Sequence, residues 1–353
     1  LQLALGSFSY HTQGGTPQTI DAFACARRLA ETNNDLSGQL RAVSGHMAVN
    51  LCCGNYRQAL AQSLHFDQLS PQAAPLLDLS AQRLRVLAQH FAGDQALAQH
   101  NGEQVIQRMA HSGHLNRFTH GFGVQYDQSV ASLTILARIL WLRGFPERAW
   151  RTANQALELA LQINHGTSIC YTLALAGVVI ARYNGDATTA RSLLDLLMQQ
   201  AQKHAVQLFH TWARHYAGTA PEQDMHGLGL VADTLVTFNA RAVDAAMFER
   251  ARNGAAGWCT AEVLRVRAEH IDDPQAAEAL LLDALGLAHQ QGALAWELRS
   301  ATALARLWQR QDRRQAAREL LNAVYARFTE GFATQDLIGV RRLLDELQDK
   351  RPA

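Results

Sequence analysis

The stretch from Ser129 to Leu161, SVASLTILARILWLRGFPERAWRTANQALELAL, indicates the fold of the whole chain. Its first half carries apolar residues at helical spacing, Gly144-Phe145-Pro146 interrupts the pattern, and a second helical run follows. Small alanines stand where the two helices would cross, which is typical of a helical hairpin. Such a hairpin cannot bury its apolar face alone, so it needs similar neighbours.

The same pattern of a turn glycine and an alanine five positions later recurs along the chain. These pairs are Gly54 with Ala59, Gly93 with Ala98, Gly144 with Ala149, and Gly185 with Ala190. Tetratricopeptide-like hairpins show this pattern with a period of about 34 residues. Here the glycines lie 39, 51 and 41 residues apart, so the repeats are degenerate. We therefore expect an all-α fold, a right-handed superhelical solenoid of degenerate tetratricopeptide-like hairpins.

We expect residues 1–353 to form a single solenoid, because a solenoid grows by adding repeats rather than separate cores. Between Thr237 and Trp258 the sequence is short by roughly one helix or hairpin against a unit of about 34 residues. This shortening predicts an irregular or missing hairpin around 237–258. The chain also begins directly in a helical pattern at Leu1, which we interpret as a segment of a longer protein.

The composition argues against nucleic-acid and membrane binding. The formal net charge is +1, and no arginine cluster reaches the density of a nucleic-acid-binding surface. We find no run of about 18 apolar residues that would predict a transmembrane helix. No signal peptide is evident either, so we expect a cytoplasmic protein without direct nucleic-acid or membrane contact.

No group of residues predicts a metal site. The five cysteines include no CxxC pair, and we expect them to be small buried side chains in a reducing compartment. They are Cys25, Cys52, Cys53, Cys170 and Cys259. His111, His114 and His120 lie close together, but no cysteine or carboxylate stands near them at zinc-site spacing. A solvated or locally hydrogen-bonded histidine loop is the favoured interpretation.

The sequence also lacks the motifs of nucleotide-binding enzymes. No GxxxxGK[ST] phosphate loop is present. The run from Gly227 to Ala232 matches GxGxxA, but a dinucleotide site needs a preceding strand, and we predict only the start of a helix there. We assign no catalytic, cofactor-binding or metal-ligating residue and expect that this chain is not an enzyme.

The C-terminal sequence resembles a known family. The residues that carry the resemblance are QGALAWELRSATALARLW at 291–308, FTEGFATQDL at 328–337 and LLDEL at 343–347. They resemble the C-terminal end of large bacterial predicted-ATPase regulators. In that family a winged-helix DNA-binding domain or a class III nucleotide cyclase domain precedes an ATPase module and a long tetratricopeptide-like tail.

Further matches upstream extend the resemblance over essentially the whole chain. They are Arg117-Phe118, Asp127-Gln128, Leu140 to Pro146, and Trp258-Cys259. The resemblance implies that this chain is the C-terminal arm of such a regulator. It also implies that ATP and Mg²⁺ belong to a module upstream, which this arm contacts within the same protein.

The predicted binding residues lie on the concave side of the expected superhelix. Thr134, Arg138 and Trp141 would project from the inner helix of the 129–161 hairpin, and Arg182 from the next inner helix. Arginine and tryptophan are enriched among binding hot spots. The alternative is structural: Trp141 packs between repeats and Arg138 pairs with a carboxylate.

A second candidate is the loop that contains Arg117, Phe118 and Asp127. It would either gate the groove or brace two hairpins, and bracing is the favoured interpretation. Long loops in compact helical arrays are often functional.

From these observations we expect a non-catalytic scaffold that binds a protein, a peptide or a small effector in its concave groove. Such a ligand controls an output domain only by binding one conformation better than another. The alternatives are a structural oligomerisation arm and an enzyme that uses the loop from His111 to His120.

Overall fold

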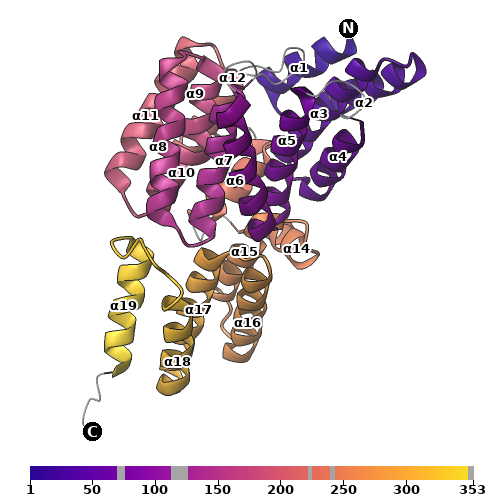
Figure 1. The fold of residues 1–353 in the computed structure, drawn as a ribbon. Coiled ribbons are helices and arrows are strands. Elements are labelled where there is room, and N and C mark those ends of the chain that lie inside the picture. The colour runs from indigo at the N-terminus through magenta and orange to yellow at the C-terminus, as the bar shows by residue number, and fades with distance from the viewer. Residues whose placement is uncertain (70–75, 113–125, 222–224, 239–242, 349–353) are drawn as a thin grey trace.

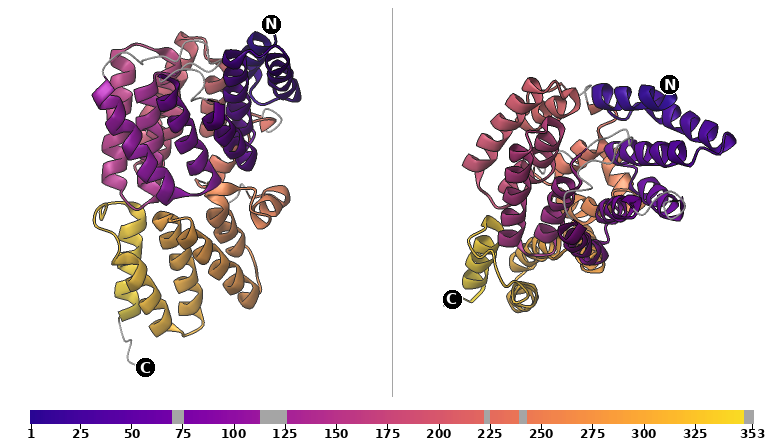
Figure 2. Two further views of the ribbon diagram at one scale, coloured as in Figure 1. Left: turned by 45° about the vertical axis from the view of Figure 1, so that its right-hand side comes forward. Right: turned by 45° about the horizontal axis from the view of Figure 1, so that its top comes forward.

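The computed structural model describes residues 1–69, 76–112, 126–221, 225–238 and 243–348. All regular structure in these ranges is helical and none is a strand, which confirms the predicted all-α class. The helices form two tiers, a larger upper one and a smaller lower one that extends from its edge (Figures 1 and 2).

The upper tier contains every helix up to residue 236. These are α1 (Gln2–Gln13), α2 (Pro17–Thr32), α3 (Leu36–Cys52), α4 (Tyr56–Leu69), α5 (Leu76–Ala92), α6 (Gln95–Ser112), α7 (Gln128–Leu142), α8 (Pro146–Gln162), α9 (Gly166–Thr172), α10 (Val178–Tyr183), α11 (Ala187–Lys203), α12 (Gln207–Ala217) and α13 (Gly229–Val236). A π-helical turn, Leu173–Gly177, joins α9 to α10.

The remaining helices lead into and form the lower tier. A connecting segment holds α14 (Ala245–Arg252) and the 3₁₀ turn η6 (Gly257–Cys259). The lower tier itself consists of α15 (Thr260–Ala268), α16 (Pro274–Gln290), α17 (Leu294–Arg310), α18 (Arg314–Tyr325) and α19 (Gln335–Gln348).

The hairpin predicted from residues 129–161 is present as α7 and α8, which pack against each other. The Asp127 carboxylate accepts a hydrogen bond from the Val130 backbone N–H at 2.9 Å and caps the start of α7. Gly144 turns the chain with φ 90°, and Pro146 occupies the first turn of α8, where a missing N–H costs nothing. The alanines of α8 at the crossing are buried, namely Ala149, Ala153, Ala156 and Ala160.

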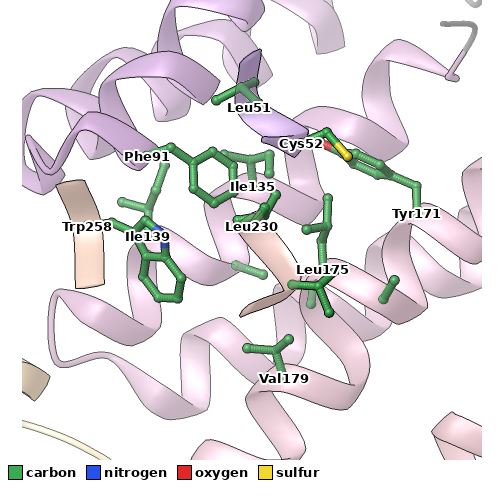
Figure 3. Close-up of a cluster of buried hydrophobic side chains, with 14 of the residues drawn as sticks. Leu51, Cys52, Phe91, Ile135, Ile139, Tyr171, Leu175, Val179, Leu230 and Trp258 are labelled. Carbon is green, nitrogen blue, oxygen red and sulfur yellow. The ribbon is translucent and has the colours of Figure 1, made fainter. Parts of the chain in front are cut away.

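The upper tier closes on itself around α13. The first helix α1 contacts α12, and α13 contacts both α3 and α12 (Figure 2, right). The backbone N–H of Gly15 donates to the Gly227 carbonyl at 3.3 Å, just before α13 begins. Figure 3 shows Leu230 of α13 among Leu51, Phe91 and Ile135 from three other helices. Helix α13 therefore packs in the core between the first helices of the chain and the later ones.

The segment predicted to be irregular, 237–258, holds α13 in its position. Asp233 of α13 is fully buried and accepts hydrogen bonds from Tyr56 Oη at 2.6 Å and Arg250 Nη1 at 2.8 Å. Arg250 of α14 also donates to the Gly54 carbonyl at 3.0 Å. Trp258 then enters the core with 0% exposure. The prediction of a single domain stays a prediction.

Helix α14 and the lower tier pack on the turns that join the two helices of each of four upper hairpins. All four predicted turn glycines have positive φ, and a Cβ added at any of them would lie within 2.8 Å of a side chain from residues 250–335. The side chains are Arg250 at Gly54, Gln291 at Gly93, Leu294 at Gly144 and Gln335 at Gly185. The positive φ favours glycine at all four turns, and at Gly185 the close approach of Gln335 Cβ adds a second reason.

One sequence-based expectation needs correction. The helical stretch Gly166–Tyr183 is long and apolar enough, by length and composition alone, to cross a membrane. We had expected no such run. Within the fold 89% of it is buried, as a core helix would be. The five cysteines are free, and Cys52, Cys170 and Cys259 are buried.

Candidate functional site

Three of the predicted groove residues lie inside the core of the upper tier. Thr134, Arg138 and Trp141 are 0%, 2% and 4% exposed. Thr134 Oγ1 lies 2.9 Å from Thr172 Oγ1, and Trp141 Nε1 donates to Asn184 Oδ1 at 2.8 Å. Their binding role stays a prediction, but the structure gives a partner no access to them.

Arg138 is held by aromatic rings and neutral acceptors instead of the carboxylate considered from the sequence. Its guanidinium lies 4.6 Å from the ring centre of Trp258 and 5.4 Å from that of Phe91. It donates to the Leu175 carbonyl at 2.9 Å and to His90 Nε2 at 3.2 Å. Burial, with the charge of Arg138, lowers the pKa of His90 to about 3, so His90 is neutral and can accept. The arrangement is a cation–π contact within a core.

The loop candidates are only partly placed. Arg117 and Phe118, together with His114 and His120, lie outside the described residues. Asp127 is described and 1% exposed. Besides capping α7, it donates its backbone N–H to Ser168 Oγ of α9 at 2.9 Å. This contact agrees with the bracing interpretation for that end of the loop.

An open cleft of about 830 Å³ lies where the two tiers meet. Its walls are the facing sides of α15, α17 and α19, and its roof comes from the α10–α11 turn and the end of α13. Arg182 lines it and is the one predicted groove residue that does so. It donates to the Tyr216 carbonyl at 2.6 Å and stacks 4.8 Å from the ring centre of Phe238.

The upper half of the cleft is organised around Arg299. Its Nη1 lies 3.0 Å from Glu262 Oε1, and its Nε lies 2.7 Å from Asp336 Oδ2. The guanidinium also stacks on Trp296, 4.9 Å from the ring centre. Arg299 thus joins one residue from each of α15, α17 and α19.

Glu262 is ionised in spite of its burial. Burial alone would raise its pKa, but the charges of Arg265 and Arg299 and their hydrogen bonds bring the pKa below its usual value. Arg265 grips it with two bonds of 2.8 and 2.9 Å and reaches Glu269 at 2.7 Å. Each carboxylate in this part of the cleft therefore has an arginine partner.

The lower half of the cleft is different. Arg306 of α17 and Arg342 of α19 both line it and are exposed. Neither makes a hydrogen bond or ion pair with any residue that the structure describes. Glu269 of α15 reaches the same level, seven residues after Glu262, but its partner is Arg265. Arg306 and Arg342 therefore leave a positive excess there.

Comparisons with known proteins identify no relative. No family model and no curated protein sequence matches this chain. The resemblance to predicted-ATPase regulators therefore remains an expectation from the sequence. The cleft has to be interpreted from its own chemistry.

The side chains that line the cleft include no His or Cys among the residues that the structure describes. Within the described part of the chain, no cluster of three His, Cys, Asp or Glu side chains could hold a metal ion. The cleft holds arginines, carboxylates, Thr302 and apolar side chains. This set is suited to binding a ligand by charge and hydrogen bonds.

Sequence reasoning missed most of this site. A signal was available in α15, where Glu262, Arg265 and Glu269 recur at the spacing of one helix face. Arg299 and Arg306 repeat that spacing in α17. Such spacing is also typical of a solvated helix face, and the sequence alone does not show that these faces turn toward one another.

Proposed function

We propose that this chain is a non-catalytic binding scaffold built of degenerate tetratricopeptide-like hairpins in a right-handed superhelix. The observation that carries the proposal is the cleft lined by α15, α17 and α19. In the lower tier these three helices alternate with α16 and α18, so the cleft occupies the face where such arrays bind their ligands. A protein, a peptide or a small effector would bind there.

We further propose that this scaffold is the C-terminal arm of a cytoplasmic, ATP-dependent regulator. The support is the sequence resemblance at 291–308 and 328–347. A ligand in the cleft would act by favouring one arrangement of the arm and its ATPase module. The DNA upstream of the codon for Leu1 tests this part: a reading frame that encodes a phosphate loop supports it, and a start codon without an ATPase overturns it.

The binding role of the cleft can be tested by filling it. Gly339 lies on the cleft wall in α19, and a Cβ there meets no other atom within 4 Å. Gly339→Trp should therefore place an indole in the cleft while the protein folds normally. Proteins and metabolites retained by the immobilised wild-type chain from a cell extract should be lost with this variant, as measured by mass spectrometry.

Gly286→Trp is the matched control. Gly286 is exposed on α16, away from the cleft, and a Cβ there also meets open space. This variant should retain whatever the wild type retains. If both variants bind the same molecules as the wild type, the cleft is not the binding site and the proposal fails.

A further inference from the structure

We propose that the lower half of the cleft binds the anionic group of a small ligand, a phosphate or a carboxylate, between Arg306 and Arg342. This inference rests on the proposed function, because it names the chemistry of the ligand that the cleft binds. Its first support is the count of charges along the walls. Five arginines and three carboxylates line the cleft, and together they carry more positive charge than the whole chain, whose net charge is +1.

The three carboxylates of the cleft pair with two of its arginines, so these five groups together carry one negative charge. Glu262 and Asp336 pair with Arg299, while Glu262 and Glu269 pair with Arg265. The positive excess therefore belongs to the three other arginines. Arg182 donates one hydrogen bond to a carbonyl and stacks on a ring, as described above. Arg306 and Arg342 donate to no residue that the structure describes.

The helix geometry brings these two side chains to one level. Both α17 and α19 begin at the upper tier, since Leu294 packs on the Gly144 turn and the Gln335 N–H donates to the Asn184 carbonyl at 3.3 Å. They therefore run parallel, away from that tier (Figure 1).

The Arg299–Asp336 ion pair fixes the register of the two helices. Arg306 follows Arg299 by about 10 Å and Arg342 follows Asp336 by about 9 Å, at 1.5 Å per helical residue. The two side chains, which both line the cleft, thus lie at about the same depth on adjacent helices. An anion bound between them would accept hydrogen bonds from both.

The cleft favours a small ligand over a macromolecule. Its volume of about 830 Å³ lies within the range of small-molecule sites. Ala303 and Ile338 add apolar wall between the upper ion pairs and the lower arginines. Arginine is the residue that best matches the planar, two-pronged geometry of carboxylate and phosphate oxygens. The expected ligand has one anionic end at the mouth and a less polar body inside.

The test uses tripolyphosphate and citrate as probes in isothermal titration calorimetry. The wild-type chain should bind at least one of them, and the binding should weaken with added salt. The variant Arg306→Gln/Arg342→Gln should bind at least about tenfold more weakly, since it loses charge-assisted hydrogen bonds. A preference for tripolyphosphate would identify a phosphate site, and a preference for citrate a carboxylate site.

The matched control is Arg310→Gln/Arg341→Gln, which removes the same charge from exposed arginines of the same two helices that do not line the cleft. It should bind the probes like the wild type. If neither probe binds at millimolar concentration, or if both double variants bind equally, the anion site is wrong. The scaffold proposal survives that result if Gly339→Trp still removes bound molecules, so the two failures are distinguishable.

Discussion

The two tiers use the same kind of helix pair and reach opposite results on their inner faces. In the upper tier α13 and Trp258 occupy the concave side, and polar residues such as Arg138 become part of a core. In the lower tier the corresponding faces of α15, α17 and α19 line an open cleft of about 830 Å³. A hairpin pattern therefore specifies which face is concave, but the fate of that face depends on whether another segment fills it.

The strongest test of this difference between the tiers removes Trp258 from the core of the upper tier. Trp258→Ala should lower the free energy of unfolding by about 4 kcal/mol, because a fully buried indole leaves a cavity and Arg138 loses its ring partner. Urea unfolding followed by circular dichroism measures the change.

Trp308 of the lower tier gives the reference for that measurement. It is only half-buried, and its Nε1 donates to Glu278 at 2.8 Å. Trp308→Ala should cost about 1 to 2 kcal/mol, since much of the ring already faces solvent. Equal losses for the two tryptophans would show that Trp258 does not hold the interior together.

Acid should weaken the upper tier through His90. Its folded pKa of about 3 lies below the unfolded value of 6.5, so the neutral form stabilises the fold. This contribution is fully present above the unfolded pKa and is lost as pH falls toward the folded one. At pH 5 the loss should reach about 2 kcal/mol.

The effect can be assigned to this residue by comparing variants. The difference in unfolding free energy between wild type and His90→Gln should shrink as the pH falls from neutral to 5, because glutamine carries no proton to gain. A difference that is constant with pH would contradict a buried neutral His90.

The smallest expected effect concerns the ion pair in the cleft of the lower tier. Asp336 is 28% exposed and pairs with Arg299 across the cleft. Asp336→Asn should cost only about 1 kcal/mol of stability, because solvent screens the pair. The same change makes the cleft more positive, so the affinity for the calorimetric anion probe should rise a few-fold. Unchanged or weaker probe binding would contradict an anion site nearby.

The sequence predicts the local structure well and the long-range structure poorly. The Gly144 turn, the crossing alanines of α8 and the all-helical class follow from short-range spacing. That α13 returns to fill the concave side does not, because the contact of Tyr56 with Asp233 joins residues far apart in the chain. The sequence also does not show that Thr134, Arg138 and Trp141, predicted to face a groove, are buried.

The cleft was missed for the same reason. Its walls come from helices that are each separated by another helix, and Arg299 meets Asp336 only after α18 has turned the chain back. The departure of residues 237–258 from the repeat was the sequence feature that indicated this long-range packing. This segment contains α14 and leads into Trp258, the parts that lock the interior.

The four glycine turns also determine how the two tiers can move. At Gly93 and Gly144 the lower tier rests directly on backbone, with no Cβ between the surfaces. The side chains in these contacts, Gln291 and Leu294, come from the lower tier, and close packing of this kind is hardly compressible and transmits strain. A ligand that spreads α17 and α19 would therefore displace the turns above them. The displacement would act first on the hydrogen bonds of Asn184. Its side chain accepts from Trp141, and its carbonyl accepts from the Gln335 N–H.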